Sequence, residues 1–121
     1  MMTQCEIKGE IVLPEHNFVL LRDFFPDDRT CFCIEVELSV GDTRSQKADL
    51  YRMSVCSPTW LQKLVETNTK GVFLRGVLLV DNFDPLKIEG RVKDLVRTIS
   101  GQDWQECHKK LSSYFRWEFV D

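Results

Sequence analysis

The sequence contains no long hydrophobic run. Its apolar stretches, such as residues 77–80, are short, whereas a helix that spans a bilayer needs about 20 consecutive apolar residues. The first residues also lack the basic region followed by an apolar one that a secretory signal requires. The sequence therefore predicts no membrane span and no export signal, and we expect a cytoplasmic protein.

Blocks of positive charge are missing as well. Lys and Arg together number 16 and Asp and Glu 19, so the formal net charge is −3 at pH 7. Binding to nucleic acid normally depends on a basic patch that neutralises phosphates, and the basic residues here form no such run. Nucleic acid is not an expected partner.

Cofactor motifs are absent too. No G-x-G-x-x-G or Walker sequence occurs, so nucleotide binding has no support. The five cysteines are odd in number and cannot all pair, so we expect reduced thiols. Only one residue separates Cys31 from Cys33, which is less than the usual spacing of a zinc knuckle, and no second Cys or His pair has that spacing. We predict neither a metal ion nor a cofactor.

What is present is the composition of one globular domain. The hydrophobic share is 43% and the charged share 29%, as in ordinary folded domains. A chain of this length buries roughly two-thirds of its unfolded surface on folding. No internal repeat, low-complexity tract or linker interrupts the sequence, so residues 1–121 are predicted to form a single domain.

Alternation of apolar and polar residues predicts a hairpin in the first half of the chain. Every second residue from Phe32 to Val40 is apolar, which indicates a half-buried strand. A polar, turn-forming segment follows at residues 41–46, and Tyr51, Met53 and Val55 then alternate again. An antiparallel hairpin is the simplest interpretation.

An N-terminal strand is expected at residues 6–13, with a possible bulge at Gly9 and an end at Pro14. Residues 18–21 either continue this strand or form a short second piece. Further along, residues 72–80 are apolar on both faces, which predicts a covered, central strand. Trp117, Phe119 and Val120 indicate a short terminal strand or an extended tail.

Three helices are predicted from their capping signals. Each start has a capping residue followed either by proline at the first helical position or by glutamate three positions on: Ser57 with Pro58, Asp84 with Pro85, and Asp103 with Glu106. Apolar residues then recur at helical spacing: Trp60, Leu61, Leu64 and Val65; Ile88, Val92, Leu95, Val96 and Ile99; and Trp104, Cys107, His108 and Leu111. We expect the first helix to end at residues 68–71 and the second at Gly101.

The order of these elements predicts an α+β fold. It consists of a mainly antiparallel sheet of about four to five strands, covered on one face by about three helices.

Cys56 is the most chemically suggestive side chain, because it lies between a strand and a helix N-terminus, where a thiol pKa is lowered. A nucleophilic cysteine also needs a base. The two histidines are His16, in an expected loop, and His108, on the buried stripe of the third helix. A small buried thiol and a hydrogen-bonded core histidine are the simpler interpretations, and we predict no catalytic residue.

Acidic residues gather in the first half of the chain, where Lys and Arg are sparse. Taken alone, each of these carboxylates is expected to be an ordinary solvated surface group. Together they form an acidic, partly strand-built surface that would attract a basic partner, which is how a binding protein uses charge. The predicted interface comprises Asp27, Asp28, Glu35, Glu37, Asp42 and Arg44.

Three segments resemble the immunity protein 8 family of bacterial polymorphic toxin systems. Residues 55–61, Val-Cys-Ser-Pro-Thr-Trp-Leu, are similar to the strand-to-helix signature of that family. The apolar segment 73–80 leading into the helix after Asp84, and the ending with Asp103-Trp104, Leu111-Ser112 and Trp117-Glu118-Phe119, resemble it too. The N-terminal residues 5–14 fit the family pattern only loosely.

The resemblance implies an antidote that binds a cognate toxin domain inside the producing cell and prevents self-killing. The matching residues are mostly apolar or capping, so they are expected to form the framework rather than to contact the toxin. Two alternatives remain open. One is a cysteine-dependent enzyme centred on Cys56, and the other is an adaptor or oligomer subunit unrelated to toxins.

Overall fold

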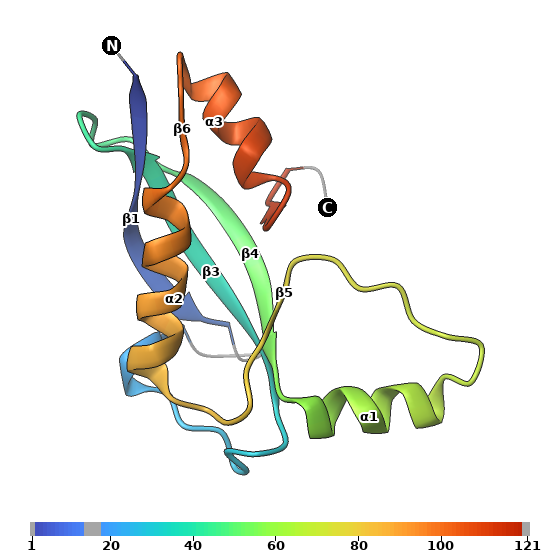
Figure 1. Cartoon of the computed structure of the whole chain (residues 1–121). Helices are drawn as coiled ribbons and strands as arrows, with labels where there is room; N and C mark the ends of the chain where they lie inside the picture. The colour runs from blue at the N-terminus through green and yellow to red at the C-terminus, as the bar shows by residue number, and fades with distance from the viewer. Residues whose placement is uncertain (1, 14–17, 120–121) are drawn as a thin grey trace.

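The computed structural model describes residues 2–13 and 18–119, which form an α+β domain (Figure 1). Seven strands make one sheet in these residues, in the order β2-β1-β3-β4-β5, while β6 pairs with β1 and β7 pairs with β4. The strands are β1 Thr3–Val12, β2 Val19–Leu20, β3 Cys33–Asp42, β4 Asp49–Cys56, β5 Val77–Leu79, β6 Ser100–Gly101 and β7 Arg116–Trp117. The helices are α1 Pro58–Thr67, α2 Pro85–Arg97 and α3 Trp104–Leu111, with a 3₁₀ turn η1 at Leu21–Asp23.

The fold class is confirmed, but the expected number of four to five strands is wrong. Strands β2, β6 and β7 contain only two residues each. A period-two pattern needs about four residues to be recognised. The sequence therefore contains no sufficient signal for these strands, and their pairing depends on tertiary contacts.

The predicted hairpin is confirmed. β3 and β4 pair antiparallel, and the alternating residues of β3 lie in the core. β1 pairs antiparallel with the other edge of β3, and its register shifts between Ile7 and Gly9, as a bulge near Gly9 requires. Residues 18–21 form the short second piece, β2 followed by η1. Pro14, the expected end of the first strand, and His16 lie outside the described residues.

The expectation of a covered central strand at residues 72–80 is wrong. Only Val77–Leu79 form a strand, which pairs in parallel with the end of β4 at the edge of the sheet. The reason is that β7 pairs with Tyr51 and Arg52 of β4. Only Ser54 to Cys56 of β4 then remain for β5 to pair with.

α2 packs across the sheet as its pattern predicts, with Ile88, Val92 and Val96 buried. The Asp84 side chain accepts from two backbone N–H groups at its start. The helix ends at Arg97, however, so the expected end at Gly101 is wrong: Gly101 belongs to β6. A Cβ there would lie 2.9 Å from the Glu106 Cβ, so close packing explains this glycine.

α3 begins as predicted, because Asp103 accepts from the Glu106 backbone N–H. The Glu106 side chain in turn accepts from the Gln102 N–H. Cys107 and Leu111 are fully buried. The predicted terminal strand is β7, which includes Trp117 but not Phe119, and Val120 lies outside the described residues.

α1 corrects the expectation that three helices cover the sheet. Ser57 caps α1 as predicted, accepting from the Trp60 backbone N–H. The helix nevertheless leaves the end of β4 and points away from the sheet, so that only α2 and α3 lie over it (Figure 1). None of the residues of α1 is buried. No helix in the described part of the chain is long and apolar enough to cross a membrane.

Candidate functional site

The six residues of the predicted interface lie along the length of β3 rather than in one cluster. Asp27 and Asp28 are exposed in the loop before β3, Glu35 and Glu37 lie within β3, and Asp42 and Arg44 lie at its far end. A strand of ten residues is about 30 Å long. The structure therefore separates the first pair from the last pair.

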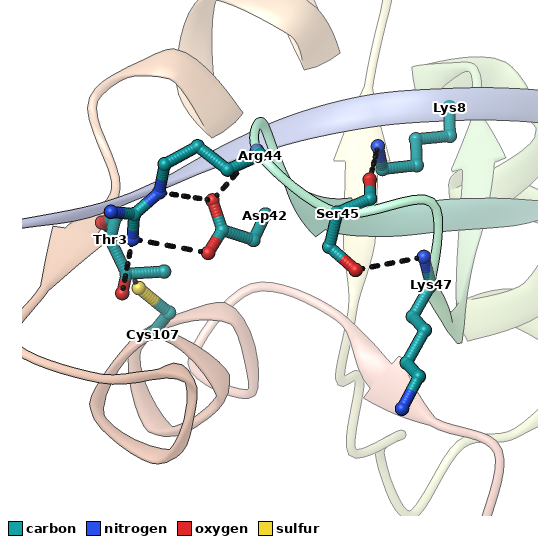
Figure 2. A network of polar contacts seen from close by, with 7 residues as sticks. All are labelled: Thr3, Lys8, Asp42, Arg44, Ser45, Lys47 and Cys107. Atoms are coloured by element: carbon teal, nitrogen blue, oxygen red, sulfur yellow. Dashed lines mark hydrogen bonds and ion pairs between the residues drawn. The ribbon is translucent and has the colours of Figure 1, made fainter.

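Asp42 and Arg44 form a closed pair at the β3–β4 turn (Figure 2). The Arg44 backbone N–H donates to Asp42 Oδ1 at 3.0 Å, and its guanidinium Nη2 donates to Asp42 Oδ2 at 3.3 Å and to Thr3 Oγ1 at 3.5 Å. These hydrogen bonds, from the Arg44 backbone first and then from its side chain, hold the pKa of Asp42 below its ordinary value. The pair ties the turn to the start of β1.

A pocket of about 320 Å³ opens beside this turn. Its lining includes the carboxylates of Asp42 and Asp49 and the indole of Trp104. Trp104 Nε1 donates to Asp49 Oδ2 at 2.7 Å, a contact between α3 and β4 that the sequence pattern does not reveal. Carboxylates beside an indole suit a cationic side chain. Lys47 also lines the pocket and offsets part of its negative charge.

Asp28 has a local structural role. Its Oδ1 accepts from both the backbone N–H and the hydroxyl of Thr30, each at 2.8 Å. The backbone hydrogen bond is the main cause of a lowered Asp28 pKa, and nearby Lys63 of α1 contributes to it.

Glu35 and Glu37 are not free carboxylates, because each faces an arginine. Arg116 of β7 donates to Glu35 Oε2, while the Ser54 hydroxyl donates to Glu35 Oε1. Arg52 Nε lies 3.6 Å from Glu37 Oε2. The strip of negative charge inferred from β3 alone is thus partly neutralised by β4 and β7.

His108 is the hydrogen-bonded histidine that its helical position predicts. Its Nδ1 lies 2.6 Å from the hydroxyl oxygen of Tyr51, a fully buried residue. The imidazole ring also packs edge-to-face on Trp117, with ring centroids 4.5 Å apart. These contacts hold α3 and β7 against β4.

Cys56 is 1% exposed, and its Sγ lies 2.8 Å from the Sγ of Cys33. The hydrogen bond to Cys33, followed by burial, raises the pKa of the Cys56 thiol well above its ordinary value. A thiol held protonated in this way is a poor nucleophile. Among residues 2–13 and 18–119, no three His, Cys, Asp or Glu side chains are placed to hold a metal ion.

An unexpected feature is a set of exposed apolar side chains on residues 58–79, the segment that we call the α1 lobe. The side chain of Phe73 is fully exposed at 106% of its reference area. Four more apolar side chains of this lobe are at least one-third exposed: Val65, Val72, Leu74 and Leu79. The sequence predicted Val65 on the apolar face of a helix and the other four residues in a covered strand. It contained no signal that these side chains would be exposed to solvent.

The described residues thus have a small α+β fold, with exposed apolar side chains on the α1 lobe and with the thiol of Cys56 buried. The chain belongs to the Immunity protein 8 family, whose pattern matches residues 11–121. The resemblance inferred from the sequence is thereby confirmed. No curated protein and no solved structure matches the chain.

Proposed function

We propose that this protein is an immunity protein that binds and neutralises a cognate bacterial toxin domain. Acting in the cytoplasm of the producing cell, it would form a one-to-one complex that blocks the active site of the toxin or the approach of its substrate. Membership of the Immunity protein 8 family is the observation that carries this proposal. No nucleic acid, membrane or cofactor is part of it.

The α1 lobe is the surface that we assign to the toxin. Its five exposed side chains belong to an amphipathic helix and to the segment that follows it, and the other described residues leave them uncovered. Phe73 is the largest of these side chains and is fully exposed. Aromatic side chains such as that of Phe73 are enriched in the cores of protein interfaces.

Only some residues of the predicted acidic interface are assigned to the α1 lobe. The charge of Lys63 contributes to the lowered pKa of Asp28, whose neighbour is Asp27, and on this ground we assign both residues to the edge of the α1 lobe. Glu35 adjoins it through Arg116, which also donates to the Arg75 carbonyl oxygen at 2.8 Å. We therefore place Asp27, Asp28 and Glu35 at the polar rim, where charge guides encounter more than it adds affinity.

Glu37, Asp42 and Arg44 lie farther along β3. We propose them as a second, weaker contact region, centred on the pocket beside Asp42.

The decisive experiment uses the toxin domain encoded beside this gene. Co-expression should protect cells from that domain, and the purified proteins should form a one-to-one complex in calorimetry. Phe73→Ser should weaken binding about tenfold or more, because a large apolar anchor is lost from the interface. Because Phe73 is fully exposed in the free protein, the Phe73→Ser variant should have the thermal stability of the wild type.

Leu86→Ser is the matched control, because Leu86 is an exposed apolar residue that belongs to α2 and not to the α1 lobe. It should leave the affinity unchanged. If the neighbouring domain neither binds nor is neutralised, the proposed function is wrong. If it binds equally well to the Phe73→Ser protein, only the assignment of the surface fails.

A further inference from the structure

Two thiols from opposite strands meet where α1 begins. Cys33 is the first residue of β3 and Cys56 the last of β4, and the two are directly opposed in the antiparallel register. Their Sγ atoms are 2.8 Å apart, compared with about 2.05 Å in a disulfide. We propose that Cys33 and Cys56 are a thiol–disulfide pair, which a low-molecular-weight disulfide oxidises reversibly.

The backbone geometry accommodates this bond. The Ser57 N–H donates to the Phe32 carbonyl oxygen, which places the hydrogen-bonded pair at 32 and 57 and makes 33 and 56 the adjacent non-hydrogen-bonded pair. Cα atoms of such pairs are about 4.5 Å apart, close to the lower limit of about 4.4 Å for disulfides. A bond at this limit is strained, and strained disulfides are readily reduced. The pair suits reversible rather than permanent cross-linking.

The two thiols have different roles. Cys33 is half-buried, whereas Cys56 is 1% exposed, so an oxidant in solution reaches Cys33 first. The hydrogen bond from Cys56 lowers the pKa of Cys33 and outweighs the opposing effects of burial and of the Glu35 carboxylate. Cys33 is therefore the attacking thiolate and Cys56 the resolving thiol.

The reaction balances with one small disulfide. The Cys33 thiolate attacks one of its sulfurs, so that a mixed disulfide forms, the small S–S bond breaks and one small thiolate leaves. In the mixed disulfide, Cys33 no longer shares the thiol hydrogen bond that is the main cause of the raised Cys56 pKa. Cys56 can then lose its proton and attack the Cys33 sulfur, forming the protein disulfide and releasing the second small thiolate. Two protein thiols lose two electrons, and their two protons end on the two small thiols.

The remaining cysteines provide internal controls. Cys5 and Cys107 also approach each other, and burial with their mutual hydrogen bond raises the pKa of Cys5 to about 12. They are only 1% and 0% exposed, so the folded protein should protect them from the oxidant. Cys31 is half-buried and only two positions from Cys33, so it controls for simple accessibility.

The test is to treat the folded full-length chain with oxidised glutathione and then count thiols after unfolding. The number should fall from the five free cysteines of the reduced chain to three, and dithiothreitol should restore all five. Tryptic digestion without reduction should yield residues 30–44 joined to residues 53–63. The Cys31→Ser protein should give the same cross-link, which assigns it to Cys33.

Single variants test the order of attack. Cys56→Ser should stop at the mixed disulfide and gain the mass of one glutathione on Cys33, whereas Cys33→Ser should show neither the adduct at position 33 nor the cross-link. Circular dichroism establishes whether each variant is folded. The peptide map of the oxidised wild-type protein tests the Cys33–Cys56 cross-link even if a variant does not fold. Five thiols after treatment, or a cross-link that involves Cys31, Cys5 or Cys107 instead, would overturn the proposal.

Discussion

The partly buried carboxyl group of Glu10 lowers the stability of the folded protein when it is ionised. It lies on β1 in a pocket formed with Leu21, Arg22, Glu89 and Lys93. Its Oε1 atom is buried and has no hydrogen-bond partner among the described residues. Burial first, and then the nearby Glu89 carboxylate, raise the pKa of Glu10 from 4.5 to about 7. An ionised Glu10 is therefore unfavourable in the folded state.

This shift predicts an unusual pH dependence of stability. A carboxyl group whose pKa is higher in the folded state stabilises fully below pH 4.5, and this contribution is lost as pH rises through about 7. Because the side chain is partly solvated, we expect the free energy of unfolding to fall by only about 1 to 2 kcal/mol between pH 5 and 8. Urea unfolding at several pH values measures it.

Glu10→Gln should remove this slope and make the protein more stable than the wild type at pH 8. Glu66→Gln is the control, since Glu66 is exposed on α1, and it should keep the slope. Parallel pH curves for the wild type and Glu10→Gln would contradict the raised pKa.

At the scale of elements, α1 depends on its first turn because its apolar side chains are not buried. The Ser57 hydroxyl, 0% exposed, accepts from the Phe32 N–H at 3.0 Å and from the Trp60 N–H at 3.4 Å. One side chain therefore caps α1 and also joins it to the start of β3. This explains why Ser follows Cys56 at the strand-to-helix junction.

Ser57→Ala should destabilise the protein by about 2 kcal/mol, because it removes a cap and leaves a buried N–H without an acceptor. Thr59→Ala, an exposed position two residues on, should change stability by less than about 0.5 kcal/mol. Thermal and urea unfolding of the two variants provide the comparison. Equal effects would mean that the Ser57 hydrogen bonds contribute nothing.

Two glycines offer alanine substitutions of opposite sign. Gly90 is exposed within α2, and nothing lies within 4 Å of a Cβ built there, so Gly90→Ala should stabilise by about 0.5 to 1 kcal/mol. Gly101→Ala would bring its Cβ to 2.9 Å from Glu106 Cβ and 3.2 Å from the Cys107 nitrogen. It should destabilise by about 1 to 3 kcal/mol. The denaturant midpoints of the two variants measure these stability changes. If both midpoints moved in the same direction, the close contact between position 101 and Glu106 would be refuted.

For the whole molecule, the sheet separates two surfaces of different character. The α1 lobe, which is apolar, lies at the end where β4 finishes, and the Asp42–Arg44 turn, which is charged, lies at the opposite end of the hairpin (Figure 1). These surfaces are too far apart for one small contact to cover both. The salt dependence of binding distinguishes between them.

If the α1 lobe anchors the toxin, the dissociation constant should change less than about threefold between about 0.1 and 0.5 M salt, because screening weakens exposed charges and not apolar contacts. A complex anchored at the Asp42 pocket would weaken much more steeply. Calorimetric titrations at three salt concentrations measure this, and a steep loss of affinity would move the interface to the charged turn.

Sequence alone determined the local features of this protein. The β3–β4 hairpin, the caps at Ser57, Asp84 and Asp103, and the family resemblance all follow from patterns within a few residues. The six interface residues could be proposed from their charge, but neither their partners nor their separation could be. Arg116, which neutralises Glu35, is 81 residues away in the chain.

The tertiary structure decided everything that depends on which edges and faces remain free. β7 takes part of the β4 edge, so β5 is short and Phe73 remains exposed. Cys33 meets Cys56 because the strand register opposes them. The apolar periodicity of the sequence indicates which side chains can be buried. It does not show that two distant segments, β5 and β7, pair with the same edge of β4. That competition decides which apolar side chains of residues 58–79 remain exposed.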